Sequence, residues 1–267
     1  MGRDNKNVRR KKLIALVTGA SSGIGRDIAR ELAKRSYNLI VVARNEDALK
    51  DVKSNLEKEY NINVDIRVVD LIDREGCKKL HEDIQKKYGI IDVLVNNAGF
   101  GDCGNFYETN LEKDLGIIDT NISALHILTK LFLKDMVKEN KGYIMNVASI
   151  AGFMPGPLMA TYYATKSYVV RLTQSIDREL KMKKSNVKVS VLCPGPVKTN
   201  FQRVADVKFN ITETKSEDVA RIAVKKMFKG KKVIFTQFHI AFTKFLAKIL
   251  PDSFMGFCCY FVQKRKL

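Results

Sequence analysis

The chain has 267 residues, of which 45% are hydrophobic and 28% charged, a balance that excludes disordered and fibrous proteins and permits one large core. Its formal net charge of +18 creates an attractive field for anionic ligands and surfaces. A nucleic-acid-binding function is nevertheless disfavoured, because the lysines are spread along polar helix faces and the sequence has no helix-turn-helix, zinc-finger or aromatic RNA-binding pattern.

Residues 1–12 form a basic tail that precedes the first apolar run, 13–17. That run is too short for the hydrophobic region of a signal peptide, and Lys6 stands where N-myristoylation requires Ser or Thr. No stretch reaches the ~18 consecutive apolar residues that would span a bilayer. The five cysteines show no metal-ligand spacing. We therefore expect a cytoplasmic protein in a reducing compartment, without a metal site.

Short apolar runs bounded by turn residues alternate with segments whose apolar residues recur every three or four positions. This alternation has no linker rich in Pro, Gly or Ser. It predicts an α/β fold for residues 13–236: a single-domain, doubly wound parallel sheet (Rossmann-like) of about seven strands with helices on both faces. The runs expected to be strands are 13–17, 39–42, 64–69, 93–95, 143–147, 187–192 and 233–235.

The first predicted strand leads into a glycine-rich turn, residues 18–25, and a helical pattern follows from Arg26. Glycines at a strand-to-helix turn let the backbone approach a pyrophosphate, and the helix N-terminus offers unpaired N–H groups and a positive dipole. A tight turn that merely needs glycines is the alternative, but the position after the first strand favours dinucleotide binding. The expected cofactor contacts are Gly19, Ser21, Ser22, Gly23, Ile24 and Gly25.

Arg44 follows the second predicted strand, where a carboxylate would bind the ribose 2′-OH of NAD. A guanidinium there suits a 2′-phosphate, so the sequence favours NADP(H) over NAD. An ordinary ion pair of Arg44 with Glu46 or Asp47 is the alternative. Asp70 and Leu71 close the third strand and are expected to line the adenine site, unless Asp70 instead caps the following helix.

Further motifs follow in chain order: Asn96-Asn97-Ala98-Gly99, Asn121, Ser149, Tyr162 with Lys166, and Pro194-Gly195 with Thr199. Together with the glycine-rich turn, this set resembles the short-chain dehydrogenase/reductase family over roughly residues 11–236. The resemblance implies a nicotinamide cofactor and a Tyr/Lys/Ser/Asn catalytic site. It also implies further cofactor contacts from Asn97, Ala98, Gly99, Tyr162, Lys166, Pro194, Gly195, Val197 and Thr199.

Carbonyl reduction needs a proton donor, and a nearby ammonium favours ionisation of a tyrosine. Lys166 lies four residues after Tyr162 and three after Tyr163, so the spacing alone admits either tyrosine. The resemblance selects Tyr162. Ser149 ends a predicted strand and is placed to donate to the substrate oxygen, although a lone serine more often caps a turn. Asn121, within an apolar helical pattern, is either a satisfied core amide or, as the resemblance implies, a residue that orders a water in a proton relay with Lys166.

These residues predict NADPH-dependent reduction of a hydrophobic ketone or aldehyde. NAD(P)-linked oxidation of a secondary alcohol and a non-catalytic dinucleotide-binding scaffold are the alternatives. Residues 197–215 are expected to form a mobile substrate loop. The resemblance suggests a homodimer or homotetramer that assembles through the helices around 111–138 and 160–182. An apolar substrate wall is expected from Phe100, Phe106, Phe153, Met154 and Phe201.

The segment 237–267 departs from the pattern of many family members, which end soon after the last strand. Its residues Phe242, Phe245 and Ile249 recur at helical spacing, while Lys244 and Lys248 mark another face. Such a helix can pack on its own domain or on a partner subunit. Apolar and aromatic residues flanked by cations also suit an anionic membrane surface, so peripheral membrane contact through residues 239–267 is a second hypothesis.

Overall fold

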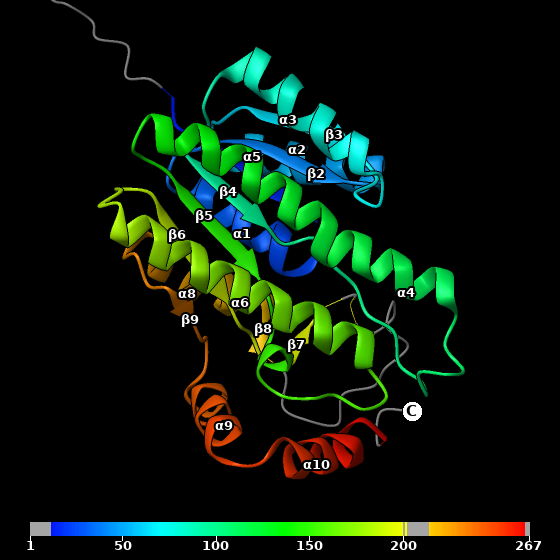
Figure 1. Cartoon of the computed structure of the whole chain (residues 1–267). Coiled ribbons are helices and arrows are strands. Elements are labelled where there is room, and N and C mark those ends of the chain that lie inside the picture. The colour runs from blue at the N-terminus through cyan, green and yellow to red at the C-terminus, as the bar shows by residue number, and fades with distance from the viewer. Residues whose placement is uncertain (1–11, 200, 202–213, 265–267) are drawn as a thin grey trace, which may run out of the picture.

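Parallel β-strands form the centre of the structure (Figure 1). The computed structural model describes residues 12–199, 201 and 214–264, and within them one sheet has the strand order β3-β2-β1-β4-β5-β6-β9. Every pairing in this sheet is parallel, which confirms the predicted fold class. The strands are β1 (Ile14–Thr18), β2 (Asn38–Ala43), β3 (Val64–Val68), β4 (Val93–Asn96), β5 (Tyr143–Val147), β6 (Lys188–Leu192) and β9 (Val233–Ile234).

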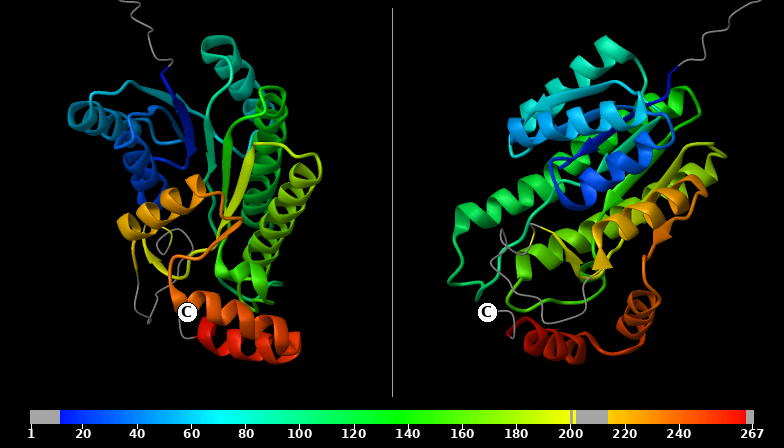
Figure 2. Two further views of the ribbon diagram at one scale, coloured as in Figure 1. Left: turned by 90° about the vertical axis from the view of Figure 1, so that its left-hand side faces the viewer. Right: turned by 180° about the vertical axis from the view of Figure 1, so that it is seen from behind.

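Helices cover both faces of the sheet (Figure 2). Successive strand residues point to opposite faces, so Val17 packs among the helices of one face and Leu16 among those of the other. Both side chains are fully buried, as expected for a parallel sheet covered on two sides. One face carries α1 (Gly23–Ala33), α2 (Glu46–Tyr60) and α8 (Ser216–Phe228); the other carries α3 (Arg74–Tyr88), α5 (Leu125–Lys138) and α6 (Ala160–Met182). Helix α4 (Leu111–Ile118) packs against α6.

The strand order reverses beside β1. The chain proceeds from β1 outward to β2 and β3, and then returns to place β4 on the other side of β1. Open α/β sheets bind ligands at such a reversal, in the crevice outside the carboxyl ends of the strands. The topology therefore positions a binding site where β1 and β4 end.

Two local features escaped the sequence interpretation. A second, two-stranded sheet pairs β7 (Val197–Lys198) with β8 (Thr214–Lys215), so the two ends of the expected substrate loop lie side by side. Most of that loop, 200 and 202–213, lies outside the described residues, as does the tail 1–11. A π-helical turn, Asp119–Ala124, interrupts the helical pattern between α4 and α5. Two-residue strands and a single π-turn are too short to produce a recognisable periodicity.

A buried polar network joins the centre of the sheet to two helices. The Asn96 amide of β4 donates to Asn146 Oδ1 of β5 at 2.9 Å and to Thr129 Oγ1 of α5 at 2.9 Å. The Asn146 amide in turn donates to Thr173 Oγ1 of α6 at 3.0 Å. These four residues are at most 2% exposed, so each of these bonds forms in a low-dielectric interior, where leaving a partner unpaired is costly.

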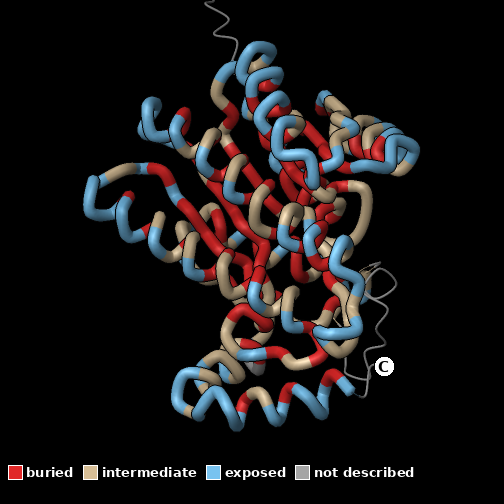
Figure 3. Tube along the Cα trace, turned by 45° about the vertical axis from the view of Figure 1, so that its right-hand side comes forward, coloured by how far each residue is buried: buried red, intermediate tan, exposed pale blue. Residues whose placement is uncertain are grey.

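The chain ends in two helices, α9 (Phe238–Ile249) and α10 (Asp252–Lys264), at the end of the molecule toward which the strands point (Figures 1 and 2). Met255, Cys259 and Gln263 lie four residues apart on α10 and are buried. They form the side of α10 that faces the domain, as the alternating colours along the lowest helix of Figure 3 show. No helix in the described part of the chain is both long and apolar enough to traverse a bilayer.

The network predicts a large effect of Asn146→Ala on stability. The substitution removes two acceptor bonds and one donor bond inside the core, so the free energy of unfolding should fall by about 2–3 kcal/mol in urea titrations. Ser190→Ala is the matched control on the next strand, because the buried Ser190 hydroxyl has no partner among the described residues. Removal of this hydroxyl should leave the free energy of unfolding unchanged or slightly higher. Equal losses in both variants would contradict a stabilising role of the Asn146 hydrogen bonds.

Candidate active site

A cavity of about 520 Å³ opens at the carboxyl ends of the strands. Its lining comes from the glycine-rich turn after β1, from the residues that follow β2, β3, β4, β5 and β6, and from the helices α6 and α10. The cavity therefore lies at the reversal of strand order, where the topology predicts a ligand.

The turn between β1 and α1 is held to the end of β4 by hydrogen bonds. Thr18 Oγ1 accepts bonds from the backbone N–H groups of Asn97 and Ala98, each at 3.0 Å. The Asn97 amide donates to the carbonyl oxygens of Thr18 and Gly19 at 3.0 and 3.2 Å. Gly19 has a φ of +63°, which favours glycine. A Cβ on Gly25 would lie 2.3 Å from the Gly19 carbonyl oxygen, so only glycine permits this close approach.

At the outer end of the cavity, Arg44 is 65% exposed at its side chain, with Nη1 3.9 Å from Asp70 Oδ2. Glu46 and Asp47 pair with Lys50, so the alternative ion pair expected for Arg44 is wrong. Asp70 does not cap the following helix either, since Asp73 accepts the capping bond from that helix. A long, exposed ion pair contributes little. The Arg44 guanidinium therefore has donors to spare at the cavity mouth.

Tyr162 and Lys166 lie in the first turns of α6 and both line the cavity. Lys166 Nζ lies 5.6 Å from the centroid of the Tyr162 ring and donates to the Val147 carbonyl oxygen at 3.1 Å. That carbonyl ends β5, so the sheet itself positions the ammonium. Ser149 follows β5 and also lines the cavity; its Oγ accepts a bond from the Ala151 N–H at 3.2 Å. Ser149 thus caps a short 3-10 turn, and its hydroxyl also hydrogen-bonds with the side chain of Tyr162.

Burial dominates the electrostatics of this pair. It raises the pKa of Tyr162 to about 12, against an opposing effect of the Ser149 hydroxyl, and lowers the pKa of Lys166 to about 8. The sequence interpretation expected the ammonium to favour the phenolate, and the structure gives the opposite direction for Tyr162. The reason is that Lys166 directs its Nζ at a backbone carbonyl and the ring face, while both groups are removed from solvent. At neutral pH, Tyr162 consequently retains the proton that a proton donor needs.

Asn121 lies in the π-helical turn, behind the cavity wall. Its amide donates to the Phe100 carbonyl oxygen at 2.9 Å and to Thr165 Oγ1 at 3.0 Å, and its Oδ1 accepts from the Phe100 N–H at 3.1 Å. These bonds fix the side chain and tie the segment after β4 to α6. Asn121 is therefore a core amide whose hydrogen bonds are satisfied by the protein, which is one of the two alternatives that the sequence left open. The water-ordering role implied by the resemblance stays a prediction.

The cavity brings together almost all residues that the sequence pointed to. Of the predicted cofactor and catalytic residues, Gly25 and Asn121 stand just behind its lining. Two of the residues expected to form an apolar wall, Phe100 and Phe201, do line the cavity. The centroid of the Phe201 ring lies 5.2 Å from that of the Tyr162 ring. It is wrong for three residues: Phe106 is 69% exposed, Phe153 packs against Phe235, and Met154 does not line the cavity. Proximity to a motif in sequence did not determine the direction of these side chains.

One wall of the cavity comes from the C-terminal helix, which the sequence interpretation missed. Gln263 of α10 is 1% exposed, lines the cavity, and donates through its Nε2 to the Tyr163 hydroxyl. Met159 adds an apolar contact beside the two tyrosines. The hydrogen bond between Gln263 and Tyr163 joins residues that are 100 positions apart, so no local sequence pattern could have revealed it.

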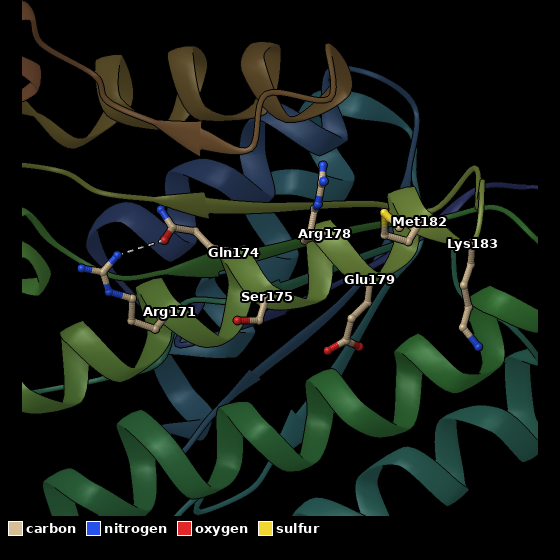
Figure 4. A pocket seen from close by; sticks show the side chains of 7 residues that line it. All are labelled: Arg171, Gln174, Ser175, Arg178, Glu179, Met182 and Lys183. Atoms are coloured by element: carbon tan, nitrogen blue, oxygen red, sulfur yellow. Dashed lines mark hydrogen bonds between the residues drawn. The ribbon is translucent and has the colours of Figure 1, made fainter.

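A second hollow, of about 710 Å³, lies along α6 and is shown in Figure 4. It is lined by seven residues between positions 171 and 183, all on or just after α6, and none of them belongs to the predicted site. The Arg171 guanidinium donates to Gln174 Oε1 at 3.4 Å, so the polar groups there partly satisfy one another. This hollow does not gather side chains from several elements, in contrast to the cavity at the strand ends.

Comparisons with known proteins agree with this geometry. Residues 13–208 match the sequence model of a family described as short chain dehydrogenase. Human estradiol 17-beta-dehydrogenase 11 is 32% identical over 263 residues, which cover 97% of this chain and 85% of the human protein. The solved structure of a short-chain dehydrogenase from Sphingobium yanoikuyae in complex with NADPH has a TM-score of 0.80 at 27% identity and covers 86% of this chain and 89% of its own.

A further solved structure is that of the bulky-bulky ketone specific alcohol dehydrogenase from Comamonas testosteroni. It has a TM-score of 0.77 at 28% identity and covers 86% of this chain and 88% of its own. The similarity therefore extends over the sheet, the flanking helices and the cavity at the strand ends.

The lowered pKa of Lys166 predicts a pH-dependent gain in stability for Lys166→Met. The unfolded chain binds the lysine proton up to about pH 10.5, and the folded chain releases it near pH 8. Below pH 8 the folded state therefore carries the full cost of a buried charge, about 3 kcal/mol, and this cost disappears as the pH rises to 10.5. In urea titrations the variant should be more stable than the natural chain at pH 7, and this advantage should shrink by pH 10. A gain in stability of the same size at pH 7 and at pH 10 would contradict a lowered pKa of Lys166 in the folded state.

Proposed function

The chain belongs to the short-chain dehydrogenase/reductase family of oxidoreductases, and from this premise we propose that it reduces the carbonyl group of a hydrophobic ketone or aldehyde with NADPH. The observation that carries the proposal is that Tyr162, Lys166 and Ser149 line the same cavity as the glycine-rich turn and Arg44. One ligand can therefore extend from a phosphate-binding end to a proton-donating end.

The residues present fit a dinucleotide phosphate. Gly19 and Gly23 have positive φ values, which expose backbone at the N-terminus of α1, where unpaired N–H groups and the helix dipole favour an anion. Arg44 supplies a guanidinium at the position of the ribose 2′-substituent. The bound NADPH of the Sphingobium yanoikuyae structure supports the same choice of cofactor.

The chemistry follows from the arrangement of the cavity. When held in this cavity, the nicotinamide would supply the hydride for the new C–H bond at the carbonyl carbon. The Ser149 hydroxyl donates a hydrogen bond to the carbonyl oxygen and holds it near Tyr162. The Tyr162 hydroxyl transfers its proton to that oxygen, which becomes the alcohol, and Lys166 stabilises the resulting phenolate once the proton has left. Asn121 keeps α6 and the segment after β4 in register through its bonds to Phe100 and Thr165.

The substrate end of the cavity is apolar. Phe100, Met159 and Phe201 line it beside the two tyrosines, so a hydrophobic ketone or aldehyde is favoured over a charged one. Ketone and steroid names among the similar proteins support this class of substrate. The word dehydrogenase in the same names favours the reverse reaction, NADP-linked oxidation of a secondary alcohol, as the second candidate, since the same residues catalyse both directions.

We further propose cytoplasmic localisation and a homodimer or homotetramer that assembles through α4, α5 and α6. Leu111 and Leu115 on α4 and Met182 on α6 are 67%, 43% and 71% exposed, so these helices carry apolar side chains that a second copy would cover.

Tyr162→Phe should abolish turnover while leaving cofactor binding intact. The substitution removes the hydroxyl proton and little volume, so the loss should exceed about a thousandfold in kcat. The measurement is NADPH oxidation with a panel of hydrophobic ketones, beside NADPH binding by fluorescence. Tyr163→Phe is the matched control, because the Tyr163 hydroxyl accepts a hydrogen bond from Gln263 and has no proposed part in proton transfer. This variant should retain turnover. Comparable activity of both variants would remove Tyr162 from its proposed role.

Arg44→Ala should weaken NADPH binding about tenfold to a hundredfold and leave NADH binding nearly unchanged, because only NADPH carries the 2′-phosphate. Fluorescence titration at physiological salt measures both, and the chain contains no Trp whose emission would interfere. Lys50→Ala, which removes an exposed cation from the same region, is the control for a general effect of charge. Equal losses for both cofactors would contradict 2′-phosphate recognition by Arg44.

A further inference from the structure

The two C-terminal helices expose large apolar side chains. On α9, Phe242, Phe245 and Ile249 are 53%, 55% and 62% exposed. Their spacing of three and four residues places them on one side of the helix. Isolated exposed apolar residues are ordinary, but a cluster of them on one side marks an interaction surface.

The next helix repeats the pattern. On α10, Phe254, Phe257 and Phe261 have the same spacing and are 51%, 62% and 47% exposed. The opposite side of α10, which carries the buried residues Met255 and Gln263, packs on the domain, so the exposed phenylalanines face away from it. The six exposed residues of α9 and α10 are called here the terminal apolar face.

Two exposed cations, Lys248 of α9 and Lys264 of α10, lie on the same helices as this face, whereas Lys244 directs its Nζ toward the Phe153 ring, 6.0 Å from its centroid. Asp252 is the sole acidic residue between 238 and 264 in the sequence. Lys264 Nζ lies 5.8 Å from the centroid of the Tyr260 ring, so this cation borders the aromatic side chains directly. Aromatic side chains bordered by lysines suit the boundary between the acyl chains and the headgroups of an anionic bilayer.

Charge also argues against a second copy of the chain as the binding partner of the terminal apolar face. Two copies that met through the terminal apolar face would bring together two sets of these lysines, each on a chain with a formal net charge of +18. An anionic lipid surface instead attracts the same lysines. Charge complementarity therefore favours lipid.

We propose that the terminal apolar face docks the protein peripherally on anionic lipid bilayers. Docking would bring the active-site cavity close to the lipid, because Gln263 on the inner side of the docking helix α10 lines that cavity. A consequence, which rests on the proposed function, is that a hydrophobic carbonyl compound dissolved in the bilayer would be the substrate.

The test is co-sedimentation of the full chain with vesicles of phosphatidylcholine and phosphatidylglycerol at physiological salt. The natural chain should sediment with these vesicles and much less with pure phosphatidylcholine. The double variant Phe254→Ser/Phe257→Ser should lower the partition coefficient at least about tenfold, since two aromatic side chains lose their burial in lipid. Lys248→Glu should weaken binding to the anionic vesicles alone.

Leu13→Ser/Val68→Ser is the matched control, because it removes two exposed apolar residues that lie outside the terminal apolar face and outside the helices of the proposed oligomer, one just before β1 and one on the edge strand β3. This variant should bind as the natural chain does. Thermal unfolding and NADPH binding establish that each variant is folded. Absence of vesicle binding by the natural chain, or equal binding by the two double variants, would overturn the proposal. So would a change of oligomeric state in light scattering that accompanies Phe254→Ser/Phe257→Ser without any change in vesicle binding. Sedimentation requires no turnover, so its outcome is independent of the proposed reaction.

Discussion

The return of the chain from β3 to β4, beside β1, is the constraint on which the rest of the structure depends. Because the connections leave β1 and β4 toward opposite sides, the ends of these strands remain uncovered. The hydrogen bonds between Thr18 and Asn97 join the two strand ends into one rigid rim. Beneath that rim, the Asn96 and Asn146 amides connect β4 to β5 and then to α5 and α6. The Val147 carbonyl, at the end of β5, positions Lys166. The helix that carries Tyr162 and Lys166 is thus tied to the central strands β4 and β5 by buried hydrogen bonds.

Stability and chemistry conflict at Lys166. Burial of the Lys166 ammonium lowers its pKa, because the charged form is disfavoured away from water. A hydrophobic side chain of the same size at this position would therefore make the folded protein more stable. Burial simultaneously raises the pKa of Tyr162, which keeps that hydroxyl protonated. The two shifts have one cause, the exclusion of water from the base of the cavity. A site that is dry enough to hold the tyrosine proton must therefore also carry the cost of the lysine charge.

The sequence was sufficient for features that depend on local pattern. The apolar runs located the strands, and the glycine-rich turn located the phosphate end of the cavity. The choice of Tyr162 over Tyr163 and most of the remaining lining residues came from the resemblance to the family, because the spacing to Lys166 admits either tyrosine. The sequence was insufficient where the direction of a helix face decided the outcome. The apolar spacing of α10 would ordinarily indicate a buried face, yet Phe254, Phe257 and Phe261 point outward and Gln263 points inward. A contact between α10 and Tyr163 depends on tertiary packing, and local periodicity contains no information about it.

The C-terminal wall of the cavity has a consequence for how such an enzyme diversifies. The sheet, the glycine-rich turn and the proposed proton donor Tyr162 all lie before residue 237, whereas Gln263 on α10 lines the same cavity. An exchange of α10 between homologues would therefore alter the shape of the pocket without changing the residues proposed for hydride and proton transfer.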